Sequence, residues 1–155
     1  MRLVIMAAAV CAAGLAIAGF AAVTVATEDA AQLVQKRIEL MKVNGKHLGV
    51  IVSYVKGKTP FSPDLAAAAQ SVSDYAKSMP ALFPPGSVTP TSRAKPEIWQ
   101  NFEDFKVKAK ALETATAELA EILKKDDPAA VQAQLRKVGN ACGGCHTVYR
   151  SGAAG

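Results

Sequence analysis

The sequence predicts an all-α fold, an antiparallel up-down bundle of four helices. Half of the 155 residues are apolar and alanine is the commonest of them, whereas the aromatic and β-branched runs that favour strands are scarce after the N-terminal segment. Four segments repeat apolar residues at three- and four-residue steps, which is the helical period. Short connections and one longer crossover join these segments, and this pattern favours antiparallel packing of neighbours.

The first helix is expected over residues 29–56. The segment Thr27-Glu28-Asp29 supplies a cap and early negative charge, and Gly57 stops the helix after Lys56. Asn44-Gly45 would normally mark a turn, yet the apolar period continues through it, so we expect Gly45 to mark close packing against haem or another helix. The apolar stripe consists of Leu33, Leu40, Met41, Leu48, Ile51, Val52 and Val55.

The second helix is expected to begin at Ser62-Pro63-Asp64, which reads as an N-cap, a proline at the first helical position and an early acid. It ends before Pro80. Residues 80–96 hold five of the eight prolines, so they form a long crossover. Leu82 and Phe83 are apolar enough to lie under the bundle.

The third helix is expected from Pro96-Glu97 to Lys124-Lys125, with Trp99, Phe102 and Phe105 on one face. Such a stripe is typical of a plain core as well as of a cofactor pocket. The fourth helix begins at Asp126-Asp127-Pro128 and runs to Arg150.

The fourth helix contains the stretch Cys142-Gly143-Gly144-Cys145-His146, which has the Cys-x-x-Cys-His spacing of covalent haem attachment. On a helix the two cysteines lie three residues apart and His146 lies four beyond Cys142, so all three side chains can meet one flat ligand. Cys142 and Cys145 would form thioethers with haem c, and His146 would bind the iron from the proximal side.

Other uses of two cysteines fit less well. A structural zinc site needs four ligands, and the second histidine, His47, lies about a hundred residues away in the sequence. A redox dithiol is expected in a βαβ setting, and a disulfide between cysteines three apart in a helix has poor geometry. Zinc and redox dithiol remain as alternatives.

Residues 1–26 resemble a secretory signal peptide, because Met1-Arg2 precedes an uncharged apolar run to Val25. We expect cleavage before Thr27 and a mature domain of residues 27–155 in the periplasm, outside the membrane. A retained anchor is the alternative, because the run is long enough to span a bilayer. Cys11 would leave with the leader, so the mature chain would keep two cysteines, both used by haem.

The charge is mild. Eighteen Lys and Arg face thirteen Asp and Glu, giving +5, or +4 once Arg2 is removed. Thirteen of the basic residues are lysines spread along the helices, which indicates a solvated surface and no nucleic-acid partner.

An exported four-helix chain with this motif on its last helix resembles the class II cytochromes c, and the resemblance covers residues 32–150. It includes residues 37–41 and 80–83, Pro96-Glu97-Ile98-Trp99 and Tyr149-Arg150. It implies a haem pocket that includes Arg37, which resembles the family's propionate-pairing arginine. Phe83, Trp99 and Arg150 are the other candidates for this pocket.

The family has two branches, and the sequence leans toward one of them. Cytochromes c′ have five-coordinate iron that binds nitric oxide or carbon monoxide, whereas a low-spin c-556 type adds a methionine from the first helix. Met41 shares a helical face with Arg37, whereas His47 lies roughly 120° around the helix from Met41. Ile38 stands where the c′ branch commonly has glutamine. We therefore expect Met41 to be the distal iron ligand.

The expected function is single-electron transfer to redox partner proteins, with gas binding as the alternative. An enzyme is not expected, because a peroxidase needs a distal acid-base group and the first helix offers Leu40, Asn44 and Gly45 near Met41. The resemblance also implies that a homodimer can form, since the surfaces of the first two helices often form the dimer contact in this family.

Overall fold

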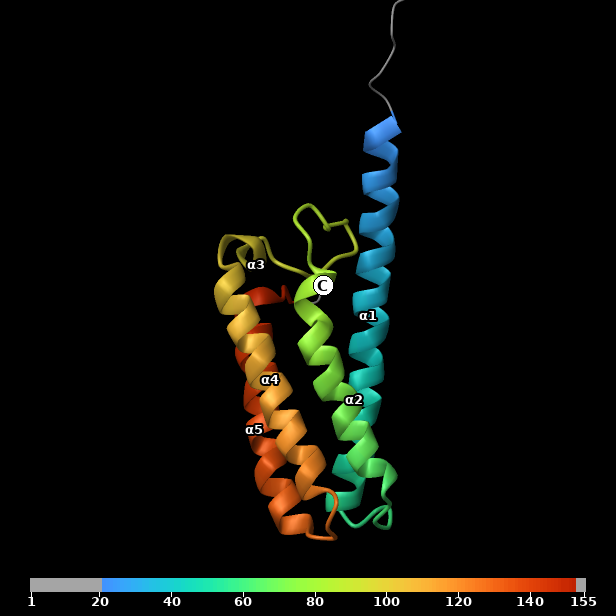
Figure 1. The fold of residues 1–155 in the computed structure, drawn as a ribbon, viewed down its shortest axis with the longest axis vertical. Coiled ribbons are helices and arrows are strands. Elements are labelled where there is room, and N and C mark those ends of the chain that lie inside the picture. The colour runs from blue at the N-terminus through green and yellow to red at the C-terminus, as the bar shows by residue number, and fades with distance from the viewer. Residues whose placement is uncertain (1–20, 153–155) are drawn as a thin grey trace, which may run out of the picture.

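The structure is a computed structural model and describes residues 21–152. Four long helices run side by side in alternating directions (Figure 1), which confirms the predicted bundle. A 3-10 turn and one short helix lie at the upper end of Figure 1. The elements are α1 Ala21–Val55, α2 Asp64–Ser78, η1 Met79–Leu82, α3 Glu97–Gln100, α4 Phe102–Ile122 and α5 Pro128–Tyr149.

The start of α5 follows the predicted sequence signals, whereas α2 begins one residue later than predicted. Pro63 takes the N-cap position of α2, and the backbone N–H of Asp64, the first residue of α2, donates to Ser62 Oγ at 3.2 Å. At α5 the side chain of Asp127 accepts from the backbone N–H of Ala130 at 3.0 Å, and Pro128 is the first helical residue. Proline suits that position because its missing N–H would have no helical partner.

The start of α1 differs from the prediction. Residues 1–20 of the predicted leader lie outside the described residues. The first described residue, Ala21, is already helical, so α1 covers residues ahead of the predicted start near Asp29. Residues 27–29 therefore lie inside α1. None of the described helices is both long and apolar enough to cross a membrane.

The predicted third helix is wrong as a single element, because it breaks at Asn101. The φ and ψ of Asn101 are −127° and 47°, so α3 ends and α4 starts anew at Phe102. Asparagine competes for local hydrogen bonds and favours helix ends, and here the carbonyl of Asn101 accepts from the backbone N–H of Phe105 at 3.0 Å.

The expectation that Gly45 packs closely against another helix is wrong. A Cβ added at this residue would have no protein atom within 4 Å. Packing of Gly45 against haem stays a prediction. The helix simply runs through Asn44-Gly45, with Asn44 buried.

Two core clusters divide the bundle along its length. The lower cluster lies toward the α1–α2 and α4–α5 turns and includes Ile51, Leu119, Leu123 and Val131. The upper cluster lies toward η1 and α3. It consists of Tyr75, Met79, Leu82, Phe83, Ile98, Phe105, Ala109 and Tyr149, with Leu33, Leu40, Met41, Trp99, Phe102 and Cys145 packed against it.

The crossover is attached to the end of α5 by backbone pairing. The N–H of Lys95 donates to the carbonyl of Tyr149 at 3.0 Å, and the N–H of Ser151 donates to the carbonyl of Arg93 at 2.9 Å. These bonds hold residues 93–95 beside the C-terminal end of the helix that carries the Cys-x-x-Cys-His motif.

Candidate haem site

A cavity of about 510 Å³ lies between α1, the crossover and the end of α5, a volume within the range of about 300–1,000 Å³ that is common for ligand pockets. It brings together six of the predicted site residues: Arg37, Met41, Phe83, Cys145, His146 and Arg150. The other lining residues are Val34, Ile38, Lys42, Met79, Thr91, Ser92, Arg93, Ala94, Ile98, Phe105 and Tyr149.

The two cysteines of the motif lie one turn apart on α5, and both are free thiols and half-buried. Burial raises the pKa of each thiol. Cys145 lines the cavity, whereas Cys142 packs against the lower cluster and is not among the lining residues. The helix continues unbroken through Gly143-Gly144, so the predicted helical spacing of the motif is present.

His146 is half-buried in the cavity wall near two arginines. Burial lowers the pKa of its imidazole, and the charges of Arg150 and Arg93 lower it further. A neutral imidazole is the form that binds a metal, so this environment suits an iron ligand.

Two methionines line the cavity, one predicted and one missed. Met41 projects from α1 and is half-buried, whereas Met79 begins η1 and is buried in the upper cluster. The signal for Met79 was present in the sequence, because it continues the apolar period of Tyr75 and Ala76 by one more turn.

Arg37 is buried, with an exposed fraction of 6%. Its Nη1 donates to Ser87 Oγ at 3.3 Å and its Nη2 donates to the Ser87 carbonyl. The guanidinium carbon lies 4.3 Å from the centroid of the Phe83 ring. Burial lowers the pKa of Arg37, while the nearby Tyr75 raises it. The sequence offered no signal for Ser87, since serine is common in loops.

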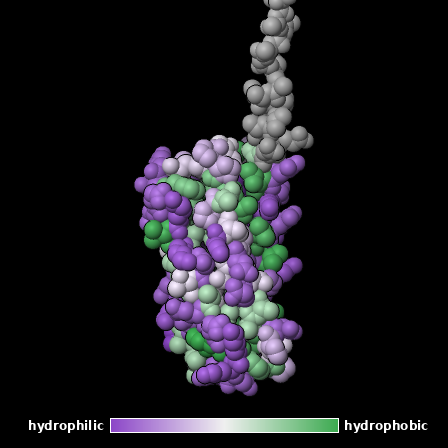
Figure 2. Space-filling model, viewed as in Figure 1, coloured by the Kyte–Doolittle hydropathy of each residue, from purple (hydrophilic) through white to green (hydrophobic). Residues whose placement is uncertain are grey.

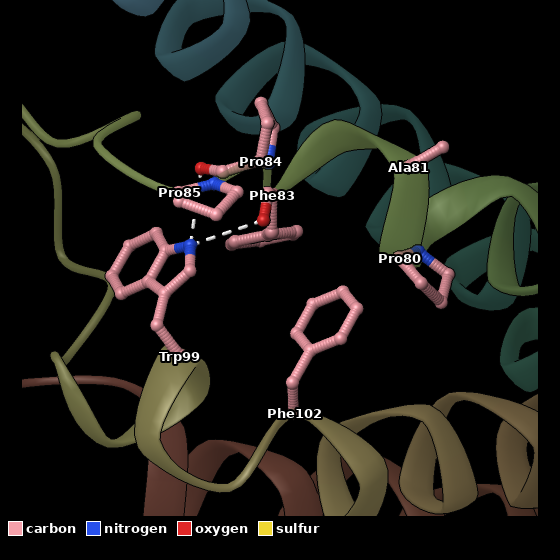
Figure 3. A pocket seen from close by; sticks show the side chains of 7 residues that line it. All are labelled: Pro80, Ala81, Phe83, Pro84, Pro85, Trp99 and Phe102. Carbon is pink, nitrogen blue, oxygen red and sulfur yellow. Dashed lines mark hydrogen bonds between the residues drawn. The ribbon is translucent and has the colours of Figure 1, made fainter.

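The structure does not bring Trp99 to this cavity. Trp99 lines a separate pocket of about 450 Å³ whose other walls are prolines, Ala81 and the rings of Phe83 and Phe102 (Figure 3). Its Nε1 donates to the carbonyls of Phe83 and Pro84, both at 3.0 Å. Trp99 therefore fixes the crossover, and Phe83 separates the two pockets.

The lining residues fit a haem with two propionates. Four cationic side chains line the cavity, Arg37, Lys42, Arg93 and Arg150, and no carboxylate is among the described lining residues. The Tyr75 hydroxyl is buried without a hydrogen-bond partner in the described structure, and it lies near the positive charge of Arg37. Apolar walls and one imidazole complete a site suited to a porphyrin.

The zinc alternative has no support in the described part of the chain. No three His, Cys, Asp or Glu side chains gather there in a group that could hold a metal ion by themselves. The bundle, the paired cysteines and the single imidazole thus define a c-type haem protein.

Comparison with known proteins shows the family. The sequence model described as Cytochrome C′ matches residues 32–150, so the chain belongs to this family and its cofactor is covalently attached haem c. A cytochrome c-556 from Agrobacterium tumefaciens (strain II Chrys) is 40% identical over 118 residues, which cover 76% of this chain and 95% of the relative. A cytochrome c′ from Pararhodospirillum photometricum is 30% identical over 118 residues, which cover 76% and 94%.

The fold agrees with solved members of the family. A cytochrome c′ with an unusual ligand-controlled dimer dissociation superposes with a TM-score of 0.72 at 29% identity, covering 79% of this chain and 97% of that chain. The predictions of a class II cytochrome c and of haem c are therefore confirmed.

Proposed function

We propose that this protein is a periplasmic electron carrier in which Cys142 and Cys145 hold the haem by thioethers, and His146 and Met41 ligate its iron. The observation that carries the proposal is that Met41 on α1 and His146 on α5 line one cavity. The 40% identity to a cytochrome c-556 supports the same branch.

Haem c supplies a one-electron couple of ferric and ferrous iron. The thioether of Met41 would favour the ferrous state and raise the potential, which suits outer-sphere transfer. The neutral imidazole of His146 would serve as the proximal ligand. Arg37, Arg93 and Arg150 would offset the propionate charges, and the buried rings of Phe83 and Phe105 would keep water away from one side of the site. We assign no catalytic residue.

The proposal is tested by optical spectra of the oxidised and reduced protein and of two matched variants. Leucine replaces methionine with little change in volume. Met41→Leu should become high-spin and bind carbon monoxide readily when reduced. Met79→Leu changes the second methionine of the cavity and should stay low-spin. If the wild type is already high-spin and Met41→Leu leaves its spectrum unchanged, the protein is a five-coordinate gas binder instead.

We also propose that residues 1–26 are removed on export. Cleavage would leave Thr27-Glu28-Asp29 at the start of a shortened α1, where a hydroxyl or carboxylate can cap the helix and complement its dipole. Intact-mass measurement of the exported protein should show the loss of residues 1–26 and the gain of one haem. A full-length, membrane-extracted chain would contradict this proposal.

The surface supports protein partners and no nucleic acid. Hydrophilic side chains cover most of the face seen in Figure 2, with smaller apolar areas between them. Several lysines pair with a carboxylate on their own helix, such as Lys106 with Glu103 at 2.7 Å and Lys110 with Glu113 at 2.8 Å. Such pairing leaves less free positive charge for a polyanion.

A homodimer through α1 is a further part of the proposal. Val43 and Val50 lie two turns apart on α1 and are 41% and 49% exposed, so they place two exposed apolar side chains on one side of this helix. The solved relative whose dimer dissociates under ligand control supports a homodimer. Sedimentation of the mature holoprotein would measure the oligomeric state directly.

A further inference from the structure

Ser87 lies in a tight turn of the crossover, and its geometry is fixed by its own bonds. Its hydroxyl donates to the Pro84 carbonyl at 2.7 Å, and its backbone N–H donates to the same oxygen at 3.2 Å. Gly86, just before it, has a φ of +79°, which favours glycine. With an exposed fraction of 3%, Ser87 is one of the few buried polar residues of the described chain.

This turn presents two acceptors to one guanidinium. Arg37 comes from α1, fifty residues earlier, and donates to both the hydroxyl and the carbonyl of Ser87. The Phe83 ring covers the guanidinium from another side, at 4.3 Å. These contacts occupy two N–H groups of the five that arginine carries, so others stay available for a haem propionate.

We infer that Ser87 is a positioning residue that holds the Arg37 charge in the wall of the haem cavity and thereby raises the reduction potential. A fixed positive charge beside the haem favours the ferrous state, which is the less positive one. The effect depends on burial, because a charge interacts far more strongly in a low-dielectric interior than in water. An arginine released from Ser87 could turn toward solvent, where its charge is screened.

The test is a potentiometric titration of the holoprotein with a matched pair of serine variants. Ser87→Ala removes one acceptor of Arg37. Ser73→Ala is the control, because Ser73 is an equally buried serine that donates to the Glu113 carbonyl at 3.0 Å and does not line the haem cavity. We expect Ser87→Ala to lower the equilibrium constant for reduction about threefold, or about 28 mV at 59 mV per tenfold for one electron. Ser73→Ala should leave it unchanged.

A double-mutant cycle shows whether Ser87 acts through Arg37. Arg37→Gln removes the charge and should lower the constant about tenfold, or about 59 mV. Ser87→Ala added to Arg37→Gln should then cause no further change, because contacting residues that act together are not additive. An equal shift in both backgrounds would overturn the inference, as would an unchanged potential in Ser87→Ala.

Arg37→Lys gives an independent test that does not alter the turn. Lysine keeps the charge but cannot reproduce the planar fork that meets both acceptors, so the potential should fall part of the way toward that of Arg37→Gln. A wild-type potential in Arg37→Lys would contradict a role for Ser87. Every variant carries the same haem c and is compared with the same wild-type protein, so the expected shifts in potential do not depend on whether the iron is five- or six-coordinate. Failure of this inference therefore leaves the Met41 proposal intact.

Discussion

Cys142 and Cys145 have different surroundings, although they are expected to do the same chemistry. Cys145 lies in the cavity wall, and Cys142 lies one turn away against the lower cluster. A thioether at Cys142 would therefore have to reach the edge of the cavity nearest the lower half of the bundle. Each thioether is a covalent link, so either one would be enough to keep the haem on the chain.

Extraction of haem into acidified organic solvent tests this assignment at the residue scale. Cys142→Ser and Cys145→Ser should each retain haem on the denatured chain, while the double variant should release it. His146→Ala is the control and should retain haem, because the imidazole takes no part in a thioether. Haem that extracts from the wild type, or stays on the double variant, would show that these cysteines are not the attachment points.

At this scale the sequence predicted the motif better than the contacts around it. The motif could be found by its spacing, whereas Arg37 and Met41 were implied by the resemblance to the class II cytochromes c. Ser87 could not be found, because its contact with Arg37 joins residues fifty positions apart through a turn whose shape depends on Gly86. Trp99 shares the apolar character of the cavity residues, and only the backbone break after it shows that it faces another pocket.

Among the elements, the short helix α3 is the one that the sequence pattern did not predict as a separate helix. The helical period of residues 96–125 suggested one helix, since Trp99, Phe102 and Phe105 fit one face. The backbone at Asn101 departs from that period, and Trp99 turns toward the crossover carbonyls as a result. Periodicity predicted the four long helices because their apolar faces set their packing, but it carries little information about a single residue that ends a turn.

Trp99→Phe tests this role of α3. The substitution removes the Nε1 donor to Phe83 and Pro84 while keeping a ring in the pocket, so it should lower the free energy of unfolding by about 1 kcal/mol, the usual net value of a hydrogen bond. The haem spectrum should stay unchanged, because Trp99 does not line the haem cavity. Thermal melts and optical spectra of the holoprotein measure both, and a shifted haem spectrum would place Trp99 in contact with the cofactor.

Over the whole molecule, the three tyrosines make the stability of the fold depend on pH. Burial raises the pKa of Tyr75 to about 12 against the opposing charge of Arg37. Burial, together with hydrogen bonds of 2.6 Å to Asp126 and to Asp104, raises the pKa of Tyr54 and Tyr149 to about 12. These groups lie in both clusters, so their ionisation affects the whole bundle.

Alkaline titration should therefore unfold the protein in a defined window. An unfolded tyrosine ionises near pH 10, so the folded state, which favours the protonated phenol, keeps this stability below about pH 10 and loses it as the pH rises toward about 12. Phenolate absorbance and helical circular dichroism should change together. A tyrosine that ionises near pH 10 while the helices remain intact would contradict the raised pKa values.

The central claim is that Met41 is the sixth ligand of the haem iron. The most direct measurement is the proton NMR spectrum of the reduced holoprotein, with the methionine methyl groups isotopically labelled. A methyl group bound through sulfur to the iron lies over the porphyrin, and its resonance is shifted strongly upfield by the ring current. The account predicts one such resonance, lost in Met41→Leu and kept in Met79→Leu. A spectrum without a shifted methyl, or one lost only in Met79→Leu, would contradict it.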